Sequence, residues 1–100
     1  MENKFETGVI LATNAVKKTM IENPKFSIFC QKCLEKHSSG DWGDLEEEDK
    51  ESNDFSLENE GRIFSSYKFS EDLKIQNVEK IWIITECNRD ATTLLFPSEY

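Results

Sequence analysis

Glycine, proline, cysteine and histidine are all scarce in this chain of 100 residues, which has four glycines, two prolines, three cysteines and one histidine. The low glycine and proline content, together with eleven aromatic residues, is typical of a folded domain and not of a disordered chain. Three cysteines are an odd number and too few for a disulfide framework, so they indicate a reducing compartment. We therefore expect a cytoplasmic protein.

Long apolar runs are also missing. No stretch of about 18 apolar residues exists, so no membrane-spanning helix is predicted. The N-terminal sequence MENKFETGVILATNAVKK has no basic region ahead of its apolar residues and no small-residue cleavage site, so a secretory signal is not expected. A chain of this length predicts one domain, residues 1–100, with a single small core.

Basic residues are fewer than acidic ones, twelve against twenty, and the imbalance is confined to one segment. Residues 1–40 have a net charge of +2, residues 41–60 of -9 and residues 61–100 of -1. Such a field disfavours direct binding to nucleic acid or an anionic membrane and favours a protein partner with a basic surface. The expected acidic face consists of Glu46, Glu47, Glu48, Asp49 and Glu51.

The first third of the chain, residues 1–35, predicts a strand followed by two helices. Phe5–Thr13 is rich in β-forming residues. Thr13 or Asn14 provides a cap for a short helix that must end near Asn23, because a proline follows. A second helix begins around Lys25. Its apolar side has the i, i+3, i+4, i+7 spacing of one buried stripe, made of Phe26, Phe29, Cys30, Cys33, Leu34 and His37.

The middle of the chain, residues 36–60, predicts a loop followed by an acidic helix. Gly40 is available for the left-handed cap that ends the preceding helix. The loop GDWGD follows, and Asp44 is expected near the start of the acidic helix, where a carboxylate accepts from free backbone amides. Because its only apolar residues are two leucines and Phe55, this helix over Leu45–Leu57 is expected to be mostly exposed.

After Gly61, residues 61–100 show the pattern of strands. Arg62–Phe69 alternates, Lys80–Glu86 is a nearly continuous apolar run that indicates burial on both faces, and Thr92–Phe96 forms a last strand. The polar stretch SEDLKIQNVE reads as a long hairpin connection. The predicted fold class is α+β: a small antiparallel sheet of three C-terminal strands, with the N-terminal strand as a candidate fourth, covered by two or three helices.

The cysteines allow two interpretations. CQKC followed by His37 has the spacing C-x2-C-x3-H, and Cys87 would supply the fourth ligand of a tetrahedral zinc site. Cys30 and Cys33 also fall on the apolar stripe, where a free cysteine packs as a small hydrophobic residue. Because there is no second CxxC or CxxH pair, packing is favoured, and no metal or cofactor is predicted.

His37 is the only histidine and so the only candidate imidazole base. Asp41 and Asp44 are close in sequence, and a carboxylate can position and polarise an imidazole. No nucleophile is marked, because the adjacent HSSG lacks a G-x-S-x-G elbow. A histidine at a helix C-terminus is also explained by its favourable interaction with the helix dipole. We favour that interpretation and predict no catalytic residue.

The acidic run also has two interpretations. DWGDLEEEDKESND is not a calcium loop, because its ligands and central glycine are out of register with an EF-hand. One interpretation is a solvated helix, and the other is electrostatic mimicry of nucleic acid, with carboxylates in place of phosphates. The net charge of -9 over residues 41–60 exceeds what solubility alone requires.

The two tryptophans and the residues after the central strand complete the candidates. Trp42 either packs beneath the loop with its indole N–H bonded locally, or forms the floor of a site. Trp82 is expected in the core. Glu86 and Arg89 form either a surface ion pair or, together with the GDWGD loop, one side of a pocket.

Read in order, the motifs from Lys36 to Tyr100 resemble a family of small bacterial proteins carried by plasmids, phages and integrative elements. The family pattern is KHxSGDWGDL…ND…GRxxSxY…KIWIITExxRxxTTxLxPxEY, and this chain has KHSSGDWGDL, ND, GRIFSSY, KIWIITE and TTLLFP in the same order. The resemblance covers about two thirds of the chain. It implies a mobile genetic element in a bacterial cytoplasm, but no particular reaction. The family pattern has polar residues at seven positions that we therefore predict to be binding residues: His37, Asp41, Trp42, Asp44, Asn53, Glu86 and Arg89.

These observations lead to two hypotheses of different classes. The first is a non-enzymatic accessory protein of a mobile element that binds a host macromolecule, such as a defence or restriction component, through its acidic face. The alternative is a small-molecule or nucleotide-binding module, or a small enzyme, with a pocket between the GDWGD loop and the Glu86–Arg89 corner. The first is favoured because no complete catalytic constellation is present.

Overall fold

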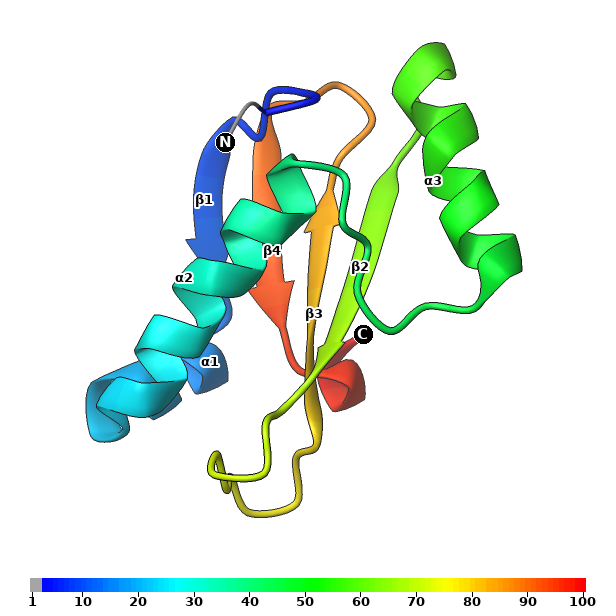
Figure 1. The fold of residues 1–100 in the computed structure, drawn as a ribbon. Coiled ribbons are helices and arrows are strands. Elements are labelled where there is room, and N and C mark those ends of the chain that lie inside the picture. The colour runs from blue at the N-terminus through cyan, green and yellow to red at the C-terminus, as the bar shows by residue number, and fades with distance from the viewer. Residues whose placement is uncertain (1–2) are drawn as a thin grey trace.

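The computed structural model describes residues 3–100 and contains, within them, three α-helices, four strands and one turn of 3-10 helix (Figure 1). In chain order these are β1 (Val9–Ala12), α1 (Asn14–Glu22), α2 (Pro24–Ser38), α3 (Glu47–Asn59), β2 (Ile63–Lys68), β3 (Lys80–Thr85), β4 (Ala91–Leu95) and η1 (Pro97–Glu99). The predicted α+β class is confirmed. No helix within residues 3–100 has both the length and the apolar character needed to cross a membrane.

The four strands form one mixed sheet in the order β1-β4-β3-β2. The three C-terminal strands are antiparallel neighbours, as predicted, with Trp82 opposite both Ser66 and Leu95. The N-terminal strand does join the sheet, but it lies parallel to β4, with Val9 opposite Ala91. The prediction of an antiparallel sheet is therefore wrong for this strand. Strand propensity does not encode direction, and the connection from β1 to the next strand, β2, contains three helices and is long enough for the chain to re-enter the sheet in the same direction.

The N-terminal strand is also shorter than the predicted Phe5–Thr13. Gly8 has a left-handed φ of 65°, and a Cβ atom there would lie 2.3 Å from the carbonyl group of Asp90. The chain therefore bends at this glycine before it enters β1. The preceding residues cross to the end of α2, where the backbone N–H of Lys4 donates to the carbonyl of Ser38 at 2.7 Å.

The first two helices begin at side-chain caps that the sequence indicates. The hydroxyl of Thr13 accepts from the N–H of Val16 at 3.3 Å, and the side-chain oxygen of Asn23 accepts from the N–H of Phe26 at 3.2 Å. A proline occupies the first turn of α2, where its missing N–H costs no hydrogen bond. Asn23 is both the C-cap of α1 and the N-cap of α2, so a single residue separates the two helices, and they pack as a pair (Figure 1).

The main core lies between the α1–α2 pair and one face of the sheet. The predicted stripe of α2 is borne out: Phe26, Cys30, Cys33 and His37 are buried, while Phe29 and Leu34 are partly buried. The buried apolar cluster comprises Val16, Phe26, Cys30, Cys33, Tyr67, Leu73, Ile81, Ile83, Leu94 and Phe96. Leu73 belongs to the connection between β2 and β3. This polar stretch therefore covers the core at the end of the sheet where β2 ends and β3 begins.

The acidic helix α3 lies beside the outer edge of β2 and away from the α1–α2 pair (Figure 1). It runs over Glu47–Asn59, two residues later than the predicted span at each end. Its N-cap residue is Glu46, whose side chain makes no capping bond, and it ends at Glu60 with a left-handed φ of 52°. The expectation that Asp44 caps this helix is therefore wrong.

Candidate functional site

The loop GDWGD is held against the outer edge of β2 as a short additional strand. Gly43 forms a parallel bridge with Ser66, the N–H of Asp44 donates to the Ser66 carbonyl at 2.7 Å, and the N–H of Ser66 donates to the Trp42 carbonyl at 3.3 Å. Gly43 has a φ of 75°, and a Cβ atom there would lie 2.1 Å from the Ser66 oxygen. Only glycine allows the two backbones to approach this closely.

Both aspartates of this loop accept hydrogen bonds from the backbone. The carboxylate of Asp41 accepts from the N–H of Gly43 at 3.0 Å, and that of Asp44 accepts from the N–H of Lys68 at 2.8 Å. The carbonyl of Asp41 accepts from the hydroxyl of Tyr67 at 2.7 Å. Asp44 therefore stabilises the edge of β2 and does not cap α3. Its carboxylate accepts from a backbone N–H at the sheet edge that would otherwise be bonded to water.

Asn53 attaches α3 to the sheet. Its side-chain amide donates to the carbonyl of Phe64 at 2.5 Å, and its side-chain oxygen accepts from the N–H of Phe64 at 3.0 Å. The primary amide thus reproduces the pair of bonds that a neighbouring strand would make. Beside it, the indole N–H of Trp42 donates to the carboxylate of Asp54 at 3.2 Å. Trp42 is buried, which agrees with the packing interpretation of this residue.

Arg89 connects the turn between β3 and β4 to the C-terminal end of α3. Its guanidinium donates to the carbonyls of Gly61 at 2.6 Å and Ser56 at 3.0 Å. A cation at this end of a helix also interacts favourably with the helix dipole. The expected ion pair between Arg89 and Glu86 does not form; the Glu86 carboxylate lies 3.8 Å from the Nε atom of Arg62 instead.

His37 lies at the centre of a buried hydrogen-bond network. Its Nδ1 atom is 2.5 Å from the hydroxyl of Ser65, and its Nε2 atom is 2.8 Å from the hydroxyl of Thr85. The Thr85 hydroxyl is 2.6 Å from that of Thr92, which donates to the carbonyl of Thr7 at 2.7 Å. The expectation of a simple helix-ending role is therefore incomplete, because the imidazole links α2 to two strands of the sheet.

The direction of each hydrogen bond in this network follows from the bond that Thr92 donates to the carbonyl of Thr7. Because Thr92 gives its proton to a carbonyl, it must accept from Thr85, and Thr85 must then accept from the Nε2–H of His37. The neutral ring consequently has an unprotonated Nδ1, which accepts from Ser65. Burial lowers the pKa of His37 from 6.5 to about 4, so the ring is neutral at pH 7.

The Ser65–His37 pair has the chemical composition of a nucleophile and its base, but not the access. Both side chains have an exposed fraction of 0%. A nucleophile and its base must reach a substrate from a cleft. The described cavities lie elsewhere, so this pair is a structural element of the core.

Phe5 occupies the space between the residues that the pocket hypothesis brings together. Its ring lies edge-on to His37, with centroids 5.3 Å apart, and tilted against Trp42 at 6.1 Å. The guanidinium carbon of Arg89 lies 5.7 Å from the centroid of the same ring. The loop and the Arg89 corner are therefore at the same end of the sheet, with an aromatic side chain of the chain itself between them.

The seven predicted binding residues are thus divided among three places. His37, Trp42 and Arg89 surround Phe5. The edge of β2 is held by Asp41, Asp44 and Asn53, and Glu86 is exposed beside Arg62. Sequence reasoning missed Phe5, Ser65 and Thr85. One signal was present: Ser65 shares a face with Ile63 and Tyr67 in an alternating strand, and a serine on an apolar face requires a hydrogen-bond partner.

The cysteines have the environment expected from packing. Cys30 and Cys33 are buried in the main core, and burial raises the pKa of each thiol to about 12. Cys87 is exposed at the β3–β4 turn. Within residues 3–100, no group of three or more histidine, cysteine, aspartate or glutamate side chains is arranged to hold a metal ion.

The predicted acidic face is exposed. Glu46, Glu47, Glu48, Asp49 and Glu51 all face solvent, as do Asp54 and Glu58 farther along α3. Phe55 has an exposed fraction of 68%, which is high for a phenylalanine. Because Glu48, Glu51, Phe55 and Glu58 are spaced by three or four residues, they lie on one side of the helix. The outward side of α3 therefore presents an aromatic ring among carboxylates.

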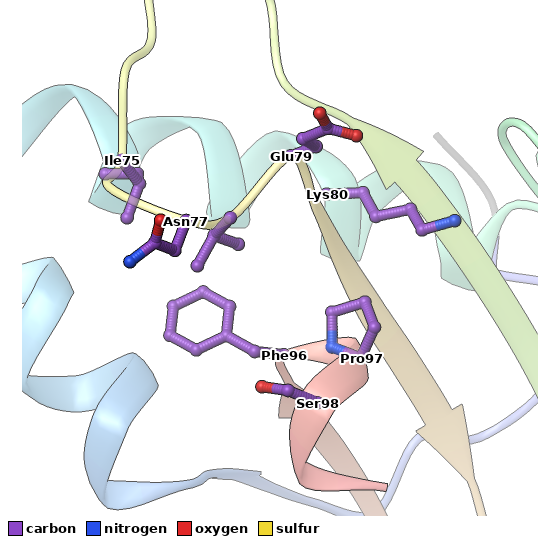
Figure 2. Close-up of a pocket in the computed structure, with 8 residues that line it drawn as sticks. Ile75, Asn77, Glu79, Lys80, Phe96, Pro97 and Ser98 are labelled. Carbon is purple, nitrogen blue, oxygen red and sulfur yellow. The ribbon is translucent and has the colours of Figure 1, made fainter.

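A hollow lies at the opposite end of the sheet from this region. It has a volume of about 570 Å³ and is formed between the β2–β3 connection and η1. Figure 2 shows Phe96, Pro97 and Ser98 on one side and Ile75 and Asn77 on the other, while the charged ends of Glu79 and Lys80 point away from Phe96. None of the seven predicted binding residues lines it.

Comparisons of the chain with protein-family models, curated protein sequences and solved structures found no match. The contacts within the chain are therefore the basis for the functional argument.

Proposed function

We propose that the protein is a non-enzymatic accessory protein of a mobile genetic element, acting in the bacterial cytoplasm, that binds a host protein through the outward side of α3. The partner has a basic surface and belongs to a defence or restriction system. The exposed ring of Phe55, surrounded by carboxylates on a helix that faces solvent, is the observation that carries this proposal.

The attachment of α3 supports this role. The inward side of the helix is held by polar bonds from Asn53 and to the carbonyl of Ser56, and its apolar contacts are few. Specific polar side chains thus position a helix that contributes little to the main core. A binding role for the outward side of α3 explains why this helix is held in a fixed position. Solubility alone does not explain it, because the same acidic residues in a loop would keep the protein equally soluble.

The composition of the outward side indicates the chemistry of the partner. Aromatic residues are enriched at the well-packed centres of protein interfaces. The charges around such a centre set the association rate and the choice of partner. Carboxylates around Phe55 would repel nucleic acid and attract lysine and arginine side chains. An apolar pocket with a basic rim is therefore the surface that this helix fits.

The experiment is affinity capture of partners from bacterial lysate with the purified protein. A partner that binds through α3 should be recovered at low salt and lost progressively as salt increases, because exposed charges are screened within about 10 Å at 0.1 M salt. Reversal of three carboxylates, Glu47→Lys, Glu48→Lys and Glu51→Lys, should abolish its recovery.

A matched control separates the position of the charge from its amount. Glu6→Lys, Glu22→Lys and Glu35→Lys change the net charge equally, but at exposed positions away from α3. This variant should still capture the partner. Equal capture by both triple variants would exclude the acidic side of α3, and a Phe55→Ala variant that binds normally would exclude the aromatic anchor.

The small-molecule alternative rests on a single observation, the Phe5 ring between Arg89 and Trp42. Removal of the Phe5 ring would leave a gap between Trp42 and Arg89, and a flat ring such as a nucleobase is the ligand that we propose for it. Thermal-shift screening of the wild type and of Phe5→Ala with nucleotides tests this function. The absence of stabilisation in both proteins would exclude it.

A further inference from the structure

One face of the sheet is apolar although no long helix covers it. The α1–α2 pair packs on the face that contains Ile81, Ile83 and Leu94, and α3 lies beside the edge of β2 (Figure 1). Opposed residues on neighbouring strands share a face, so the strand register defines the other one. This open face consists of Val9, Leu11, Ala91, Thr93, Leu95, Lys80, Trp82, Ile84, Phe64, Ser66 and Lys68.

The open face is more apolar than the solvated face of a sheet usually is, although Ser66, Lys68, Lys80 and Thr93 belong to it. A sheet with one face in water normally places polar residues there. Here each strand contributes at least one large apolar side chain: Ile84 and Leu95 are buried, Phe64 and Trp82 are partly buried, and Val9 and Leu11 have exposed fractions of 63% and 45%. Exposed apolar side chains on a folded chain, here on β1, are typical of an interaction site.

A groove of about 260 Å³ lies within this face and is lined by Arg62, Phe64, Trp82, Ile84 and Tyr100. The indole of Trp82 is packed edge-on against Phe64, with centroids 5.0 Å apart, and against Tyr100 at 5.7 Å. Its buried N–H has no acceptor among residues 3–100, so packing holds this ring. The groove therefore has aromatic walls and room for one large side chain of a partner.

The charge of the open face is opposite in sign to that of the protein. Arg62, Lys68 and Lys80 contribute three positive charges and Glu86 one negative charge, and the carboxylate of Asp44 lies beside Lys68, whereas the whole chain has a net charge of -8. Arg62 stands at the groove itself, where it donates to the hydroxyl of Tyr100 at 2.7 Å and lies 3.8 Å from Glu86. The rim therefore favours an acidic partner.

We propose that the open face binds an amphipathic helix of another protein, with an apolar stripe on the sheet, one aromatic side chain in the groove and acidic residues beside Arg62, Lys68 and Lys80. The four strands span roughly 14 Å at about 4.8 Å per strand, and a helix is about 10 Å wide, so one helix covers the face. A second copy of this chain fits poorly, because stacking two such faces brings together like charges on two molecules that already repel.

This proposal is independent of the proposed function, because the carboxylates of α3 lie outside the open face. The probes are two synthetic amphipathic 18-residue peptides with the same leucine and phenylalanine stripe, one flanked by glutamate and the other by lysine. Calorimetric titration should show binding of the glutamate peptide. Amide NMR shifts should map that binding to β2, β3 and β4.

Two charge variants locate the site. Arg62→Glu with Lys68→Glu should weaken binding of the glutamate peptide at least tenfold, while the matched change Lys17→Glu with Lys18→Glu on α1 should leave it unchanged. Leu11→Ser, at a half-exposed position, should weaken it without loss of folding. The proposal is overturned if the glutamate peptide does not bind, if its shifts map outside the sheet, if both charge variants behave alike, or if ultracentrifugation shows a dimer that Leu11→Ser dissociates.

Discussion

The buried imidazole of His37 should make the stability of the protein depend on pH. Burial lowers its pKa in the folded state to about 4, while the unfolded chain has the ordinary value of 6.5. Between these two values the unfolded state binds more protons than the folded state, so acid favours unfolding. The contribution is therefore fully present above pH 6.5 and is lost as the pH falls towards 4.

The magnitude follows from the difference between the two pKa values. Each pKa unit corresponds to about 1.4 kcal/mol, so the complete loss is about 3 kcal/mol. Between pH 7 and pH 5 the free energy of unfolding should fall by about 2 kcal/mol from this one group. For a domain whose total stability is about 5–15 kcal/mol, such a change is readily measured.

The assay is urea unfolding from pH 7 to pH 5, with His37→Gln as the reference protein. The glutamine side chain has an oxygen that accepts from Ser65 and an N–H that donates to Thr85, but it does not titrate. All the carboxylates of α3 are common to both proteins, so their contribution cancels. The stability difference between wild type and variant should shift by about 2 kcal/mol in favour of the variant at pH 5. A constant difference would refute the reasoning.

Three further substitutions test the loop and the attachment of α3, each by urea unfolding at pH 7. Gly43→Ala should cost at least about 2 kcal/mol, because its Cβ atom meets backbone, whereas Gly40→Ala, whose Cβ atom meets a flexible lysine, should cost about 1 kcal/mol. Asn53→Ala should cost about 2 kcal/mol, and Asn59→Ala, on the exposed end of the helix, less than about 0.5 kcal/mol. Arg89→Ala should cost about 1–2 kcal/mol and should accelerate amide hydrogen exchange in the last turn of α3; equal exchange rates would exclude a capping role.

The elements of the fold were predictable where local chemistry determines them. Thr13 and Asn23 are cap residues followed by helical spacing, and Pro24 marks the boundary between two helices. The β2–β3–β4 order follows from the preference of consecutive strands to lie next to one another in a sheet. The parallel pairing of β1 was not predictable, because it is decided by how the α1–α2 pair packs and not by any residue in Val9–Ala12.

The central strand illustrates a second limit. The run KIWIITE correctly indicates burial on both faces for Ile81, Ile83 and Ile84, but the prediction that Trp82 lies in the core is wrong, because this side chain is only partly buried on the open face. Hydrophobicity reports that a side chain prefers to leave water. It does not report whether this chain or a partner provides the cover, so Trp82 could not be placed from the sequence.

The candidate site was predictable as a set of residues but not as a set of contacts. His37, Asp41, Asn53 and Arg89 stand out because polar side chains interrupt apolar or turn patterns. Their partners are backbone atoms and hydroxyls distant in sequence, such as the carbonyl of Phe64 for Asn53. A polar residue that satisfies a backbone group and one that binds a ligand have the same signature in a single sequence.

In the structure, the hydrogen-bond partner of each polar atom shows whether a side chain satisfies a group within the chain or remains available to bind a ligand. The side chains of His37, Asn53 and Arg89 direct their donors or acceptors into the chain, where loss of a buried partner costs about 1–3 kcal/mol, so these groups cannot turn towards a ligand without destabilising the fold. Binding energy is available where contact groups remain unused. Two surfaces meet that condition: the outward side of α3, with Phe55 exposed among carboxylates, and the open face of the sheet, with Leu11 and the Trp82 groove. Since one is acidic and the other basic at its rim, they should recognise different partners, and a protein of this size would then join two molecules.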